Sequence, residues 1–172
     1  MEVKLVRPSI KFKESYLAGL REFQEEGLPW VMDIDPIELS KNFEKFVEKE
    51  NSKMTLWTKD KPVHQTELWA TIGIEYVGRI AIRHKLNEDL KIMGGHIGYD
   101  TRPSFRRRGI ARSMLQQSLP IAKSLGITEV LLTCNDDNVA SIRIIEKNGG
   151  ELRDRKLQHP GGPMKRYYWI KL

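Results

Sequence analysis

The chain has 172 residues, of which 40% are hydrophobic and 30% are charged. This composition excludes a collagen-like or disordered protein, and the length supports a self-sufficient core, so we expect residues 1–172 to form one domain. Lysines and arginines number 29 against 23 aspartates and glutamates, and the net charge of +6 favours an anionic partner: nucleic acid, a membrane surface or a phosphorylated small molecule.

Two helices are predicted in the first fifty residues, after a short strand at residues 3–7. The first helix is predicted from apolar residues that recur at helical spacing, and Gly27 and then Pro29 end it. The apolar residues are Tyr16, Leu17, Leu20 and Phe23. The second begins at Asp35, a capping residue followed by a proline at the first helical position. It is predicted to continue to about Glu50.

The middle of the chain reads as strands and the last third as alternating helices and strands. Strands are predicted at residues 67–74, 77–84 and 93–99, with turns between them, as an antiparallel meander. A helix at 109–125, a strand at 130–134, a helix at 138–147 and strands at 152–156 and 166–170 follow. This order predicts a mixed α/β sheet with helices on both faces.

Residues 100–112, DTRPSFRRRGIAR, join a predicted strand to a predicted helix and contain a dense cluster of positive charge. The segment contains one acidic residue, Asp100, and five arginines: Arg102, Arg106, Arg107, Arg108 and Arg112. Backbone N–H groups at the start of a helix bind phosphate oxygens, and Gly109 lets the backbone approach a ligand closely. The segment therefore predicts a diphosphate site. A solvated surface and an RNA-binding module using the arginines remain alternatives.

The sequence RRRGIA at residues 106–111 resembles the Arg/Gln-x-x-Gly-x-Gly/Ala motif of the GNAT superfamily of N-acetyltransferases. Residues 94–99 (GGHIGY) and 102–104 (RPS) resemble the lead-in of bacterial members. LLTC at 131–134, NVAS at 138–141 and NGG at 148–150 are similar to the superfamily's second cofactor motif. The resemblance covers residue 66 to the C-terminus, and it implies a mostly antiparallel sheet that splays at the cofactor strand.

The resemblance implies transfer of an acetyl group from acetyl-CoA directly to a primary amine of a small molecule or peptide. The backbone at residues 107–111 would hold the CoA diphosphate, and the strand at 99–101 would pair with the pantetheine arm. The implied cofactor-binding residues are Thr101, Arg106, Arg107, Arg108, Gly109, Ile110, Ala111, Arg112 and Asn138. A non-catalytic acyl-CoA sensor is the alternative. Members of the superfamily often dimerise, so a homodimer is one expected assembly.

Two residues are candidates for proton transfer. His96, on the strand beside the cofactor, titrates in the range that a general base needs. The alternative for His96 is a structural histidine. The superfamily's tyrosine acid falls at Ile145, which cannot donate a proton, so Tyr99, a water bound by Asn135, or Cys134 could replace it, or solvent could protonate the departing thiolate. We expect Cys134 to be a buried strand residue and not a nucleophile.

Acceptor recognition is expected in the segments that match the superfamily poorly. Trp30 with the carboxylates of Glu26, Asp33 and Asp35 would form an acidic, aromatic mouth for a cationic amine. The alternative is that the carboxylates are solvated and that Trp30 only packs.

Location and metal content follow from absences in the sequence. The single cysteine excludes an intramolecular disulfide, residues 1–8 lack the apolar region of a signal peptide, and no apolar run is long enough to span a membrane. The histidines His64, His84 and His159 lack metal-ligand spacing. We therefore expect a cytoplasmic protein that binds neither membrane, metal nor nucleic acid.

Overall fold

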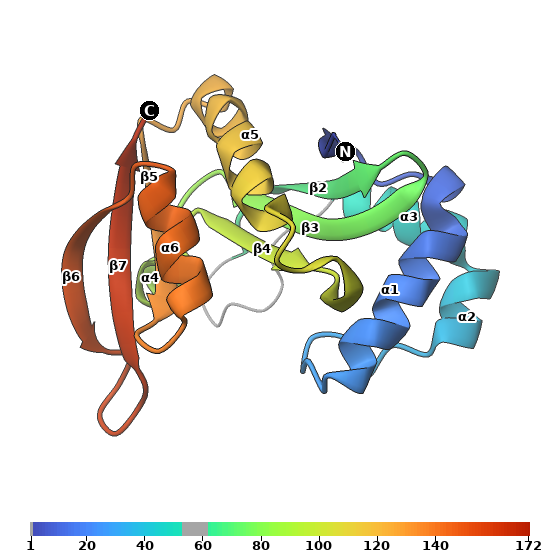
Figure 1. Cartoon of the computed structure of the whole chain (residues 1–172), viewed down its shortest axis with the longest axis horizontal. Coiled ribbons are helices and arrows are strands. Elements are labelled where there is room, and N and C mark those ends of the chain that lie inside the picture. Colours follow the sequence, from blue (N-terminus) through green and yellow to red (C-terminus); the bar gives the residue numbers. More distant parts are fainter. Residues whose placement is uncertain (1, 53–61) are drawn as a thin grey trace. The chain divides into compact units, whose positions relative to one another are not determined.

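A computed structural model of the chain describes residues 2–52 and 62–172 (Figure 1). These residues form two compact units. The first unit comprises residues 2–52, 67–80 and 99–114, and the second comprises residues 62–66, 81–98 and 115–172. Each unit is described by itself.

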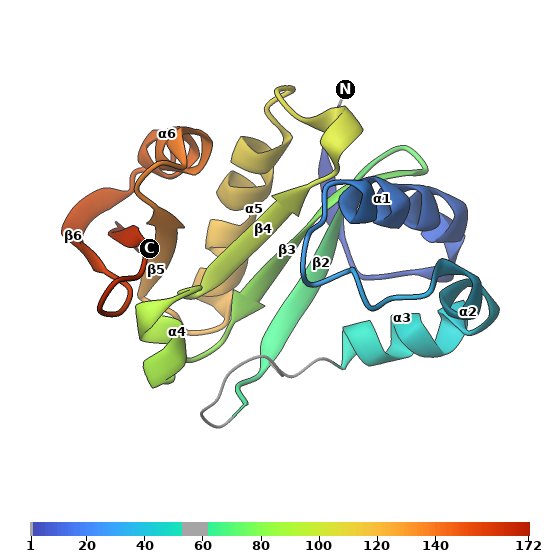
Figure 2. The ribbon, with the colours of Figure 1, turned by 90° about the horizontal axis from the view of Figure 1, so that it is seen from below.

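The strands of the described residues form two sheets. The first has the order β1 (Lys4–Val6), β2 (Gln65–Ile72), β3 (Glu75–Arg83) and β4 (Ile97–Thr101), and Figure 2 shows β2, β3 and β4 side by side. The second has the order β5 (Glu129–Asn135), β7 (Met164–Lys171) and β6 (Glu151–Leu157), and β7 pairs antiparallel with both neighbours. The predicted mixed α/β class is confirmed.

Helices account for the rest of the regular structure. They are the 3-10 turns η1 (Ile10–Phe12) and η2 (Pro103–Phe105) and the α-helices α1 (Lys13–Glu25), α2 (Pro36–Lys41), α3 (Phe43–Asn51), α4 (Glu88–Ile92), α5 (Ile110–Ser124) and α6 (Val139–Lys147). Among residues 2–52 and 62–172, no helix combines the length and apolar composition needed to cross a membrane.

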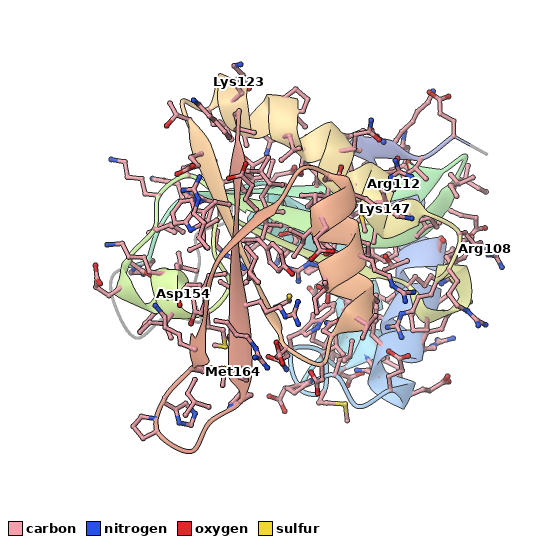
Figure 3. All side chains as sticks on the ribbon, turned by 60° about the vertical axis from the view of Figure 1, so that its left-hand side comes forward. Arg108, Arg112, Lys123, Lys147, Asp154 and Met164 are labelled. Atoms are coloured by element: carbon pink, nitrogen blue, oxygen red, sulfur yellow. The ribbon has the colours of Figure 1, made fainter. Side chains whose placement is uncertain are left out.

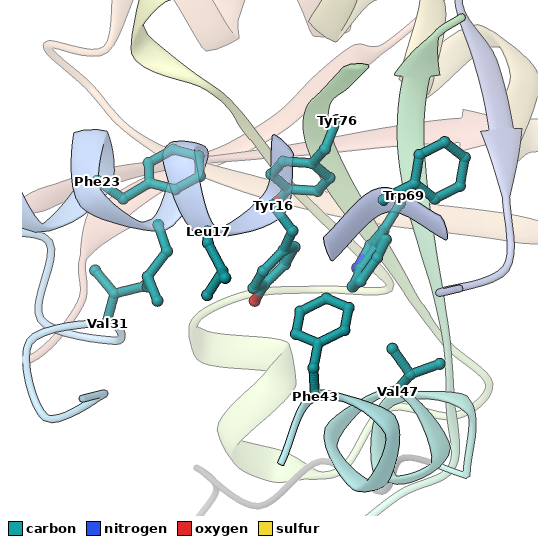
Figure 4. Packing of buried hydrophobic residues seen from close by; sticks show 10 residues of the cluster. Tyr16, Leu17, Phe23, Val31, Phe43, Val47, Trp69 and Tyr76 are labelled. Atoms are coloured by element: carbon teal, nitrogen blue, oxygen red, sulfur yellow. The ribbon is translucent and has the colours of Figure 1, made fainter. Parts of the chain in front are cut away.

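The core of the first unit is aromatic (Figure 4). Tyr16 of α1 stacks on Trp69 of β2, with the ring centroids 4.6 Å apart, and it also contacts Phe43 of α3 and Tyr76 of β3. Aromatic pairs of this kind contribute roughly 0.5–1.5 kcal/mol each beyond the area they bury. They fix α1 and α3 on the sheet, and α1 in turn reaches the loop that follows β4.

In the second unit, the central strand β7 of the sheet makes hydrogen bonds to two helices. The Tyr168 hydroxyl donates to Glu146 of α6 at 2.9 Å, and the Tyr167 hydroxyl donates to the carbonyl of Ile92 at 3.0 Å. Every residue of the edge strand β6 is exposed. Its sequence, ELRDRKL, is mostly charged, which disfavours pairing with other chains.

Three sequence-based boundaries are wrong. The single helix predicted from residue 36 to 50 is interrupted at Asn42, whose side-chain amide donates to the carbonyl of Glu38. The segment predicted as a turn between the strands at 77–84 and 93–99 contains α4, which Asn87 caps by accepting the N–H of Leu90. The strand predicted from residue 93 begins only at Ile97, because Gly94 and Gly95 both have positive φ.

Candidate functional site

The segment between β4 and α5 forms a loop with an unusual backbone. Arg107 has a φ of 60° and Gly109 a φ of 76°, both in the left-handed region. The N–H of Ser113 donates to the carbonyl of Gly109 at 3.0 Å, so the helical bonding of α5 begins at Gly109. The N–H groups of residues 110–112 therefore have no partner within the helix. Such a loop presents donors at the positive end of a helix, which suits an anion.

The five arginines of the segment divide into two groups. Arg102 is buried and Arg106 is ion-paired with Glu26, so the charges of these two side chains are engaged within the protein. Arg107, Arg108 and Arg112 are exposed and make no hydrogen bond or ion pair with any described residue, although the Arg108 guanidinium lies over the Phe105 ring at 5.1 Å. Figure 3 shows Arg108 on the loop and Arg112 on α5. Three cations therefore remain for a ligand.

Helix α1 holds this loop from one side. Glu22 accepts hydrogen bonds from Arg102 and from both the N–H and the hydroxyl of Ser104. Partial burial alone would raise the pKa of Glu22, but these hydrogen bonds lower the pKa below its usual value. The role of Glu22 was not predicted from the sequence, because Glu22 lies about 80 residues from its partners. The signal in the sequence was the matched four-residue spacing of Glu22 and Glu26 at the end of α1 and of Arg102 and Arg106 on the loop.

The end of β4 carries two of the predicted site residues, Tyr99 and Thr101, which are both half-buried. The backbone carbonyl of Thr101 accepts a hydrogen bond from Arg106 at 3.2 Å. Its hydroxyl oxygen is buried and has no hydrogen-bond partner among the residues that the structure describes. Buried hydroxyls are normally satisfied, so this one fits a site that a polar ligand completes.

His96 lies in the second unit and is bonded to β5. Its Nδ1 accepts the backbone N–H of Leu131 at 2.9 Å, and the backbone N–H of His96 donates to the Leu131 carbonyl at 2.8 Å. Burial, and then the charge of Arg83, lower the pKa of His96 to about 4. The imidazole is therefore neutral at pH 7, with its Nδ1 lone pair already engaged. These contacts favour the structural alternative, and the general-base role stays a prediction.

Asn138, the N-cap of α6, and Ile145 within α6 both make contacts inside the second unit. Asn138, exposed at the start of the helix, caps it by accepting the N–H of Ser141 at 3.0 Å. Ile145 is buried, with 1% of its surface exposed, and packs against Gly150. The position of the superfamily's acid is thus filled by a core side chain, while the predicted cofactor contact of Asn138 stays a prediction.

Cys134 is buried on β5, and burial raises the pKa of its thiol. A protonated thiol is a poor nucleophile, because the thiolate is the reactive form. We expect Cys134→Ala to retain full turnover in an assay of thiol release from acetyl-CoA. The control is the unfolding midpoint, which should fall modestly for the smaller side chain. Loss of turnover in a folded variant would point instead to an acetyl-cysteine route.

The acidic mouth predicted around Trp30 is reassigned in part. The carboxylate of Glu26 binds Arg106, and that of Asp35 accepts the N–H groups of Ile37 and Glu38 at the start of α2. The Trp30 ring packs against Phe23 and lies under the guanidinium of Arg79. Two of the three carboxylates are therefore bound within the fold and are not simply solvated, whereas the packing of Trp30 agrees with the alternative.

Within the parts of the chain that the structure describes, no group of three or more histidine, cysteine or acidic side chains is placed to hold a metal.

The predicted site residues fall in both units. Tyr99, Thr101 and residues 106–112 belong to the first, whereas His96 and Asn138 belong to the second. The structure thus brings the loop residues together with the end of β4.

Comparison with known proteins identifies related folds. The family model described as an acetyltransferase (GNAT) domain matches residues 15–151. No curated protein matches the sequence. Solved structures with similar folds include the microcin C7 self-immunity acetyltransferase in complex with acetyl-CoA and AMP, with 13% identity, 99% of this chain and 93% of that chain covered, and a TM-score of 0.66.

Two further structures have the same fold. The ribosomal L7/L12 alpha-N-protein acetyltransferase in complex with coenzyme A has 16% identity and a TM-score of 0.68, with 99% of this chain and 94% of that chain covered. The aminoglycoside acetyltransferase AAC(6')-Ib in complex with coenzyme A has 14% identity and a TM-score of 0.63, with 99% and 95% covered. At these identities the similarity establishes the fold, and the predicted acyltransferase-like architecture is confirmed.

Proposed function

The chain belongs to the GNAT acetyltransferase family, and from this premise we propose that it transfers the acetyl group of acetyl-CoA directly to a primary amine. Residues 1–172 would act as one catalytic domain. The structures with coenzyme A or acetyl-CoA bound support the cosubstrate. The acceptors in their names are a ribosomal protein and aminoglycosides, both of which carry amines, so a small molecule or a peptide fits equally here.

The backbone of residues 106–112 is the observation that carries this proposal. Its two left-handed residues and the unbonded N–H groups at the start of α5 match the needs of a diphosphate. The exposed guanidinium groups of Arg107, Arg108 and Arg112 would neutralise the phosphate charge. The unsatisfied hydroxyl of Thr101 adds a donor at the end of β4.

The chemistry requires an activated carbonyl and two proton transfers. The thioester supplies an acyl carbon that an amine can attack, with formation of the C–N bond and loss of the thiolate. The backbone of β4 at residues 99–101 would orient the carbonyl. The amine must lose a proton and the thiolate must gain one. Tyr99 is the candidate acid and His96 the candidate base, and both roles stay predictions.

A sensor that binds acyl-CoA without catalysis is the second candidate, and the buried Ile145 favours it. Calorimetry with CoA, combined with thiol release measured over a panel of primary amines, separates the two. Binding with amine-dependent thiol release supports the transferase. Binding without release for any amine supports the sensor, and absence of CoA binding contradicts both. Binding of RNA but not CoA would favour the nucleic-acid module.

A further inference from the structure

Two acidic residues at the C-terminal end of α1, Glu22 within the helix and Glu26 directly after it, contact two arginines of the segment between β4 and α5. Glu22 and Glu26 are four residues apart, and Glu26, the C-cap, keeps a helical backbone conformation, so both side chains lie on the same side of the helix end. Arg102 and Arg106 have the same spacing in sequence. The pairs match in order: Glu22 binds Arg102 at 2.8 Å, and Glu26 binds Arg106 at 2.5 Å. All four residues belong to the first unit.

Glu22 accepts hydrogen bonds from donors at the start of the 3-10 turn η2. One carboxylate oxygen accepts from Arg102 and from the Ser104 hydroxyl, and the other accepts the Ser104 N–H at 2.9 Å. Ser104 lies in the first turn of η2, where N–H groups have no partner within the helix. Residue Arg102, which precedes the turn, supplies no side-chain cap. A carboxylate from α1, 82 residues away in sequence, therefore supplies that cap.

Glu26 fixes the next part of the loop. Its two oxygens accept from both terminal nitrogens of Arg106, while the Arg106 Nε donates to the carbonyl of Thr101. Arg106 thus ties the residue after α1 to the end of β4. Arg107 follows directly with a left-handed φ of 60°, a conformation that a non-glycine residue keeps only when its surroundings hold it.

We propose that Glu22 and Glu26 are positioning residues that hold residues 102–107 in the conformation that binds the CoA diphosphate. The inference rests on the proposed function, since it concerns the same loop. Both carboxylates are occupied by Arg102, Ser104 and Arg106, so they would act through these residues and not on the diphosphate itself. Their negative charge lies near an anion site, so the long-range electrostatic effect of removing it would strengthen CoA binding, whereas loss of positioning would weaken it. The two effects have opposite signs, which makes the inference testable by substitution.

The test compares Glu22→Gln and Glu26→Gln with Glu25→Gln. Glu25 ends α1, is exposed and makes no hydrogen bond or ion pair with the described residues, so its variant has the same charge change without the contacts. We expect the Kd for CoA, measured by calorimetry, to rise about tenfold for Glu22→Gln and about threefold for Glu26→Gln. For Glu25→Gln we expect a Kd within about twofold of the wild type.

Kinetics give a readout that a general loss of stability would not move. The KM for acetyl-CoA is expected to rise with the Kd, while kcat at saturating acetyl-CoA stays within about twofold of the wild type. Ser104→Ala, an exposed change that removes only the hydroxyl donor, provides a variant that keeps the backbone contact; its Kd is expected to rise about twofold. A wild-type Kd in folded Glu22→Gln would overturn the positioning role alone. A wild-type protein that does not bind CoA would overturn the proposed function as well.

Discussion

Replacing Gly109 with leucine is expected to abolish CoA binding by a protein that remains folded. Gly109 has a φ of 76°, and no atom lies within 4 Å of the position that a Cβ would occupy, so the free protein has room for a side chain. The backbone strain of a non-glycine residue there costs about 1–2 kcal/mol. A leucine on the loop would keep phosphate oxygens out of hydrogen-bonding distance of the neighbouring N–H groups.

We expect the affinity for CoA to fall at least about a hundredfold, which corresponds to roughly 2.7 kcal/mol. Gly126→Leu is the matched control, because Gly126 follows the other end of α5, has a φ of 83° and also has open space around its Cβ position. Calorimetry with CoA and thermal unfolding should show equal losses of stability but a loss of binding only at Gly109. Unchanged affinity in Gly109→Leu would refute the phosphate-loop assignment.

The left-handed turn of the proposed cofactor loop could be predicted from sequence at Gly109, because the determinants of that turn are contiguous. The glycine at 109 permits the left-handed backbone, and the arginines stand beside it. The conformation of Arg107 could not be predicted, since a non-glycine residue adopts it only when tertiary contacts hold it. The roles of Glu22 and Glu26 also depend on tertiary contacts. Sequence reasoning placed Glu26 in an acceptor mouth, because its partner Arg106 is 80 residues away.

The helix boundaries failed where polar side chains bind the backbone. The amide of Asn42 competes for the carbonyl of Glu38, and such local bonds end a helix despite continued apolar periodicity. Asn87 caps α4, whose five residues are too few for a periodic pattern. Capping residues were therefore a stronger signal than periodicity for these short elements.

The stability of the protein is expected to fall as the pH is lowered from about 6.5 to 4, with His96 as a principal cause. Burial, and then the charge of Arg83, lower the pKa of His96 from 6.5 to about 4. The unfolded chain therefore binds a proton in this range that the folded protein does not bind. Protonation of Nδ1 would also break its hydrogen bond from Leu131. The contribution is complete above pH 6.5 and is lost as the pH falls towards 4.

A difference of one pKa unit corresponds to about 1.4 kcal/mol, so the contribution lost between pH 6.5 and 4 is about 3 kcal/mol. His96→Asn separates this effect from other titrations, because Oδ1 of asparagine can accept the Leu131 N–H but does not titrate. Denaturant unfolding at pH 7 and pH 4 should show a fall in unfolding free energy that is smaller in His96→Asn than in the wild type by about that amount.

His159→Asn is the control for this measurement, since it removes an exposed imidazole in the loop between β6 and β7. Its unfolding free energy should fall between pH 7 and pH 4 as much as that of the wild type. If His96→Asn also shows the wild-type fall, His96 would have to be protonated equally in the folded and unfolded states. The hydrogen bond from Leu131 to Nδ1 would then not persist in solution, and the lone pair would be available for the general-base role.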